Sequence, residues 1–294
     1  MSSWVAFTVL AALMQSVRTA GQKQLSGSVS PMTATLARYL FGLPFVAVYV
    51  LFLFRFEASS ALGSALSNPV FMLYAISASV AQIIATVLLV RVFSFRNFAV
   101  GTSFAKTEAI QTAVIGMALF GSTLTERAWL AIVIGFIGIA VVSVPVRNTL
   151  WEPRNILLGT LSGTAFAFTS LWLREASLSL PYNALASAAI TLAVMVAMQT
   201  LICCVYSYLK EPGQLQLLFL RWPLALFIGL SSAMGSAGWF TAMTLQNPAV
   251  VKSVGQIEFI FTLLITTIFF KERISGREYL GMMLIITSVV LLLS

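Results

Sequence analysis

The chain has 294 residues, of which 59% are hydrophobic and 9% charged, and its formal net charge is +8. A soluble domain carries about 25% charged residues, so the composition excludes an ordinary soluble protein and indicates a polytopic membrane protein. Histidine is absent, and Cys203 and Cys204 are adjacent in an apolar run, so we expect no metal site, disulfide framework or cofactor. The basic residues lie singly between apolar runs, which is typical of contact with lipid headgroups and not of nucleic-acid binding.

Ten apolar segments follow one another along the chain and predict an all-α membrane protein with ten transmembrane helices. Most approach the ~20 residues needed to cross ~30 Å of hydrocarbon. The period-two alternation of a membrane β-barrel is not seen. The segments run near residues 4–22, 31–54, 69–92, 98–120, 127–146, 156–178, 183–208, 222–245, 248–270 and 276–293.

Short matches at an offset of 150 residues relate the two halves of the chain, and Glu108 corresponds to Glu258 in this way. Ten helices then divide into five and five. Because five is odd, the second half would enter the membrane from the opposite side, as in many transporters. We therefore predict two inverted five-helix repeats, residues 1–150 and 151–294.

The two repeat-related glutamates indicate a polar cavity between the repeats. A carboxylate at bilayer depth costs about 2.5–3.5 kcal/mol on the mildest scale. Helical spacing places Glu108 and Gln111 on one face and Lys106 on another. Two close carboxylates do not both ionise cheaply, so Glu108 and Glu258 are candidates for proton coupling. The alternatives are a packing role for the glutamates, and a salt bridge from Lys106 to another helix in place of substrate binding.

Other polar or aromatic residues inside the segments are further candidates for substrate binding. Gln256 occupies the position that corresponds to Lys106, and Gln82 and Arg38 lie within the third and second segments. Trp239 has small neighbours that leave room for a ligand. Lys252, near the start of a segment, is expected to extend to the headgroups.

Lysine and arginine are more frequent in the connections after odd-numbered segments, where Arg18 is counted, than after even-numbered ones. By the positive-inside rule, this distribution places both termini outside.

The stretches Ala37–Pro44 and Phe269–Ser275 resemble the second-helix arginine region and the short acidic turn of EamA-type proteins in the drug/metabolite transporter superfamily. The resemblance covers essentially the whole chain. The chain departs from the pattern after the fourth segment, where Ser122 stands opposite Glu272. The resemblance implies both termini in the cytoplasm, against the basic-residue count, so the orientation stays open.

The resemblance implies a secondary transporter of small polar metabolites in a bacterial inner membrane, coupled to protons or a counter-substrate. Lys106 with Glu108 and Glu258 would suit an amino-acid-like zwitterion. The alternatives are a proton-coupled exporter of organic cations or drugs and a lipid-handling flippase. An enzyme is the least favoured class, because no nucleophile–base set is visible. Membrane lipid and a small-molecule substrate are the expected partners, and the oligomeric state is left open.

Overall fold

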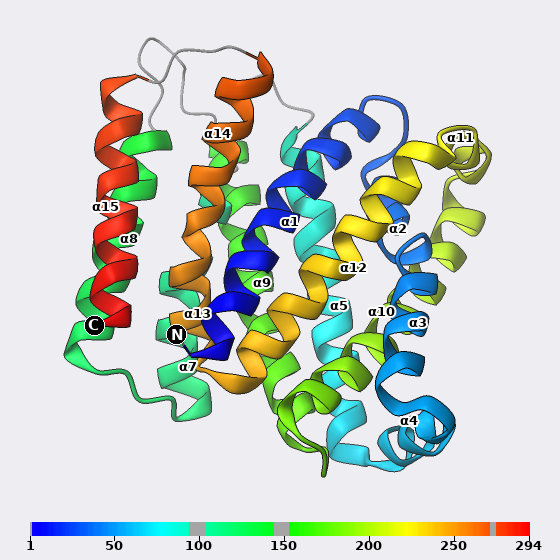
Figure 1. The fold of residues 1–294 in the computed structure, drawn as a ribbon. Coiled ribbons are helices and arrows are strands. Elements are labelled where there is room, and N and C mark those ends of the chain that lie inside the picture. Colours follow the sequence, from blue (N-terminus) through cyan, green and yellow to red (C-terminus); the bar gives the residue numbers. More distant parts are fainter. Residues whose placement is uncertain (1, 94–103, 144–152, 271–274) are drawn as a thin grey trace.

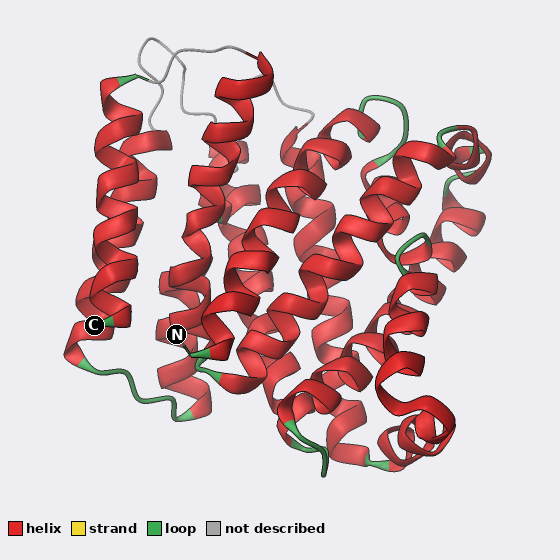
Figure 2. Cartoon of the chain, in the orientation of Figure 1, coloured by secondary structure: helices red, strands yellow, loops and turns green. Residues whose placement is uncertain are grey.

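The computed structural model describes residues 2–93, 104–143, 153–270 and 275–294, and every regular element in these ranges is helical (Figures 1 and 2). The elements are α1 (Ser3–Leu25), α2 (Pro31–Leu40), α3 (Leu43–Phe54), η1 (Arg55–Glu57), α4 (Ala58–Ser67), α5 (Pro69–Phe93), α7 (Glu108–Phe120), α8 (Glu126–Ser143), α9 (Pro153–Leu178), α10 (Ala184–Lys210), α11 (Gln214–Leu220), α12 (Trp222–Leu245), α13 (Pro248–Val254), η2 (Gly255–Ile257), α14 (Glu258–Phe270) and α15 (Gly276–Leu293).

Six helical stretches of the described chain are long and apolar enough to cross a membrane. They are α2 with α3, α5, α9, α10, α12 and α15. Large apolar side chains such as Phe52, 80% exposed, face outward, which is the arrangement expected of a surface in contact with lipid. The structure is therefore that of an all-helical, multi-pass membrane protein, while ten crossings and the inverted layout stay predictions.

Proline and asparagine set several helix starts. Pro31 begins α2, and the Ser30 hydroxyl accepts a hydrogen bond of 3.1 Å from the Thr33 amide. Asn247 precedes Pro248 and accepts from the Ala249 amide at 2.9 Å. Because proline lacks an amide hydrogen, it costs little in a first helical turn. These starts agree with the sequence prediction, whereas the short helices α4 and α11 were not predicted.

The most extensive packing joins helices from different halves of the chain: α1 lies against α12, α5 against α9 and α8 against α15 (Figure 1). The offset of 150 residues relates α1 to α9 and α5 to α12. The contact of α1 with α12 in one arrangement therefore corresponds to the contact of α9 with α5 when the halves are exchanged. The centre of the bundle is thus enclosed by helices of both halves.

Two helices are broken at positions 150 residues apart. The chain is helical at Phe104 and Ala105, turns at Lys106 and Thr107, and resumes as α7 at Glu108. In the second half, α13 ends before the 3-10 turn η2, and α14 begins at Glu258. The prediction of unbroken helices over 98–120 and 248–270 was therefore wrong. The breaks favour the charged form of both glutamates. Each glutamate lies in the first turn of a half-helix, where the helix dipole stabilises a negative charge.

Candidate functional site

Two ion pairs cross between the halves of the chain. The Lys106 ammonium donates to Glu258 Oε2 at 2.5 Å, and the Lys252 ammonium pairs with Glu108 Oε1. Each half contributes one lysine and one glutamate. The expected proximity of two unpaired carboxylates is therefore replaced by two lysine–carboxylate pairs. The prediction that Lys252 extends to the headgroups was wrong. Its side chain is only 12% exposed and lies at the centre of the site.

A hydrogen-bond chain from α1 and α12 holds one of these pairs in place. Trp239 Nε1 donates to Gln15 Oε1 at 2.9 Å, and Gln15 Nε2 donates to Glu258 Oε2 at 2.7 Å. The Lys252 ammonium lies 4.6 Å from the centre of the Trp239 ring, within the range of a cation–π interaction. Trp239 therefore touches both ion pairs, directly at Lys252 and through Gln15 at Glu258.

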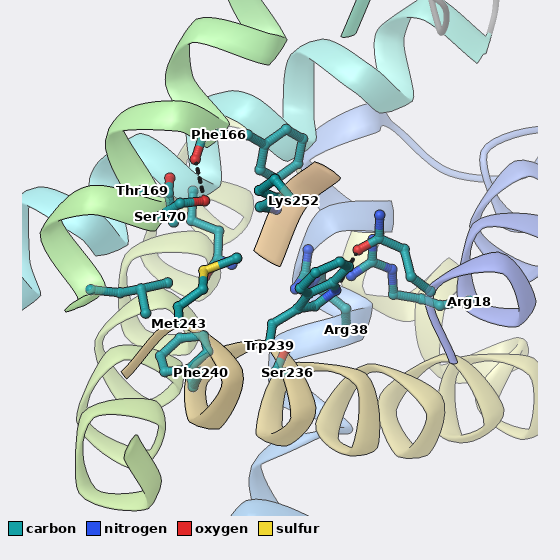
Figure 3. A pocket seen from close by; sticks show the side chains of 13 residues that line it. Arg18, Arg38, Phe166, Thr169, Ser170, Ser236, Trp239, Phe240, Met243 and Lys252 are labelled. Atoms are coloured by element: carbon teal, nitrogen blue, oxygen red, sulfur yellow. Dashed lines mark hydrogen bonds between the residues drawn. The ribbon is translucent and has the colours of Figure 1, made fainter. Parts of the chain in front are cut away.

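Small cavities surround the ion pairs. One of about 30 Å³ lies between α1, α2, α9 and α12, and we call it the central cavity (Figure 3). A second cavity of about 60 Å³ is lined by Lys106, Glu108 and Glu258, and it shares Arg18 and Lys252 with the first. These volumes hold a few water molecules at most. A larger molecule would fit only if the surrounding helices moved apart. The central cavity is lined by Gln15, Arg18, Arg38, Gln82, Phe166, Thr169, Ser170, Leu173, Ser236, Trp239, Phe240, Met243 and Lys252.

Arg18 lines this site, whereas its proximity to the end of the first apolar segment predicted that it lies in a connection between helices. It lies within α1, which extends to Leu25, and it is 6% exposed. Arg18 therefore does not count among the basic residues of the connections after odd-numbered segments, from which the orientation was predicted. A signal was present in the sequence: Gln15, Arg18 and Gln22 recur at spacings of three and four residues, which places a polar stripe on one face of an apolar helix.

Arg38 and Gln82 both line the central cavity. Arg38 is 4% exposed, and its Nη1 donates to Thr86 Oγ1 at 3.2 Å. Gln82 Oε1 accepts from Gln199 Nε2 at 2.7 Å. Arg38, Gln82 and Gln199 lie on α2, α5 and α10, which carry none of the ion-pair residues. Polar side chains are therefore also found on the part of the cavity surface that lies away from the ion pairs.

The two remaining candidate glutamines lie in different surroundings. Gln256 lines a small cavity with Glu108 and Glu258, and its amide nitrogen and oxygen are buried without a partner in the described part of the chain. Gln111 lines none of these cavities, and its Nε2 donates to Thr107 Oγ1 at 2.6 Å. The acidic turn of the sequence analysis, including Glu272, lies outside the described residues except at its ends.

Comparisons with known proteins agree with this architecture. The model of the EamA-like transporter family matches the chain twice, over residues 2–144 and 154–294. A crystal structure of another protein has the same fold, with a TM-score of 0.74 and 15% sequence identity over 99% of this chain and 96% of the other. A search of curated proteins gave no match.

Proposed function

Because the chain belongs to the EamA-like transporter family, we propose that it is a secondary transporter that moves a small, amino-acid-like metabolite across a bacterial inner membrane by alternating access. The observation that carries this proposal is the crossed arrangement of Lys106–Glu258 and Lys252–Glu108 beside buried cavities. Both pairs join one half of the chain to the other, so a movement that separates the halves at these cavities must break them.

The ion pairs supply a route for proton coupling. An isolated buried charge is costly, and each lysine here is stabilised by the glutamate that it contacts. A proton that neutralises Glu108 or Glu258 removes the partner of one lysine. That lysine is then available to a carboxylate of the substrate. When the glutamate loses the proton again while its lysine holds the substrate, the free carboxylate is available to an ammonium group. Proton binding and substrate binding are thereby linked through the same four side chains.

Counterflow in proteoliposomes, with and without a pH gradient, tests the proposal. The Glu108→Gln and Glu258→Gln variants should lose the dependence of transport on the pH gradient, and the double variant should lose most transport. Glu126→Gln is the matched control, because Glu126 is exposed at the start of α8. Unimpaired, pH-dependent transport by the double variant would show that these carboxylates carry neither protons nor cargo.

A further inference from the structure

Six charged side chains from the described part of the chain line the cavities around the ion pairs, and their charges do not cancel. Four are cationic, namely Arg18, Arg38, Lys106 and Lys252, and two are anionic, namely Glu108 and Glu258. Each lysine is paired with a glutamate. The excess positive charge therefore resides on the two guanidinium groups.

Neither guanidinium forms an ion pair with a described residue, and both are buried, with 6% of Arg18 and 4% of Arg38 exposed. The Nε atom of each has no hydrogen-bond partner within the described ranges. Two buried cations in this situation need a counter-ion, since burial without one is expensive.

The two side chains also share a cavity. Both line the central cavity, and in Figure 3 they extend toward the same space, beside Trp239 and Ser236. Arg18 also borders the cavity of the ion pairs, and Arg38 borders a third cavity with Gln82 and Ser236. The guanidinium groups thus lie where neighbouring cavities share lining residues. Arginine binds carboxylates and phosphates with two parallel hydrogen bonds, which makes it suited to an oxyanion at such a place.

We infer that the central cavity binds an oxyanion group between Arg18 and Arg38, so that the cargo is a small organic anion with net negative charge. This inference rests on the proposed transport function and narrows its substrate class. A neutral zwitterion would leave the whole excess charge uncompensated, and an organic cation would add to it. The cargo anion is the missing counter-ion of the two arginines.

Thermal denaturation of the purified protein with compounds matched in size but not in charge tests this inference, because a ligand of the folded state raises its apparent stability. The probes are L-glutamate against L-glutamine, and succinate against putrescine. Inorganic phosphate distinguishes a phosphate ester from a carboxylate as the preferred oxyanion. We expect glutamate, succinate or phosphate to stabilise the wild-type protein, and glutamine and putrescine to have smaller effects.

The Arg18→Gln and Arg38→Gln variants should each lower the affinity for the stabilising anion by about 30-fold or more. Without ligand they should be as stable as the wild-type protein or more stable, because each removes a buried charge that has no counter-ion. A purely structural arginine would give the opposite change in stability. Arg277→Gln, at an exposed site at the start of α15, is the control and should behave as wild type.

Stabilisation by glutamine or putrescine equal to that by the anions would overturn the inference, as would full retention of the anion effect in both glutamine variants. If these variants do not fold, the order of the probes on the wild-type protein decides the question by itself. The same probes in counterflow separate this inference from the proposed function. Transport of a zwitterion or cation that ignores both substitutions would reject the anion site but keep the transporter. Stabilisation by anions without any counterflow would keep the site but reject transport.

Discussion

Replacing Lys252 by methionine should destabilise the protein more than any other single lysine change in the site. The Lys252 and Glu108 side chains are each 12% exposed, so water screens their pair little. Without Lys252, the one contact of the Glu108 carboxylate within the described ranges is a long one of 3.5 Å from the Ser170 hydroxyl. Removing one partner of a buried ion pair costs about 3–5 kcal/mol. For Lys106→Met we expect about 1–2 kcal/mol, because Lys106 is 27% exposed and water replaces part of its interaction.

Equilibrium unfolding in mixed micelles measures these differences, with a double-mutant cycle to isolate the pair. Combining Lys252→Met with Glu108→Gln should restore stability relative to Lys252→Met alone, with a coupling energy on the order of 1–3 kcal/mol. Lys210→Met, at the exposed end of α10, should change stability by less than about 0.5 kcal/mol. A Lys252→Met variant as stable as Lys210→Met, or strictly additive effects of the two changes in the site, would contradict this prediction.

Two further predictions concern the elements that support the site. Gly255→Ala should lower the free energy of unfolding by about 1–3 kcal/mol and reduce transport. An added methyl group would collide with the Trp239 ring at the break between α13 and α14. The control is Gly63→Ala, which has open space around it and should be neutral or stabilising in the same unfolding assay. Arg174→Met should lower the free energy of unfolding by about 1–3 kcal/mol, because Arg174 Nη1 donates at 2.5 Å to the carbonyl of Gln246, which follows α12. If either variant had the same free energy of unfolding as the wild-type protein, the role proposed for that residue would be refuted.

The position of the candidate site could be predicted from the sequence, because a carboxylate inside an apolar segment is costly and therefore rare. Glu108 and Glu258 satisfied that criterion at related positions, and the structure places both beside the cavities. The breaks before them could not be predicted. Neither break contains proline, and Gly255, at the second, gave no stronger signal than other glycines of the apolar segments. Its significance comes from the Trp239 ring that packs on it, which is a tertiary contact.

Arg18 was missed for a different reason. A basic residue close to the end of the first apolar segment was assigned to the following connection, since lysine and arginine usually flank membrane helices. The helix extends to Leu25, one turn further than the apolar run indicated. Arg18 already fell within the predicted segment 4–22, and in the structure it lies inside the bundle, where Gln15 and Gln22 accompany it on the same face. A search for polar residues at helical spacing, in place of a count of basic residues, would have identified it.

The crossed pairing itself depends on a difference between the repeats. Lys106 lies in the turn two residues before Glu108, whereas Lys252 lies on α13, six residues before Glu258. The lysines therefore occupy non-equivalent positions, although each reaches the glutamate of the other half. One consequence is unequal exposure, 27% for Lys106 and 12% for Lys252. Because water weakens an exposed pair more than a buried one, the Lys106–Glu258 pair requires less free energy to separate. We therefore predict that the two halves present unequal barriers and that opening of the site begins at Lys106.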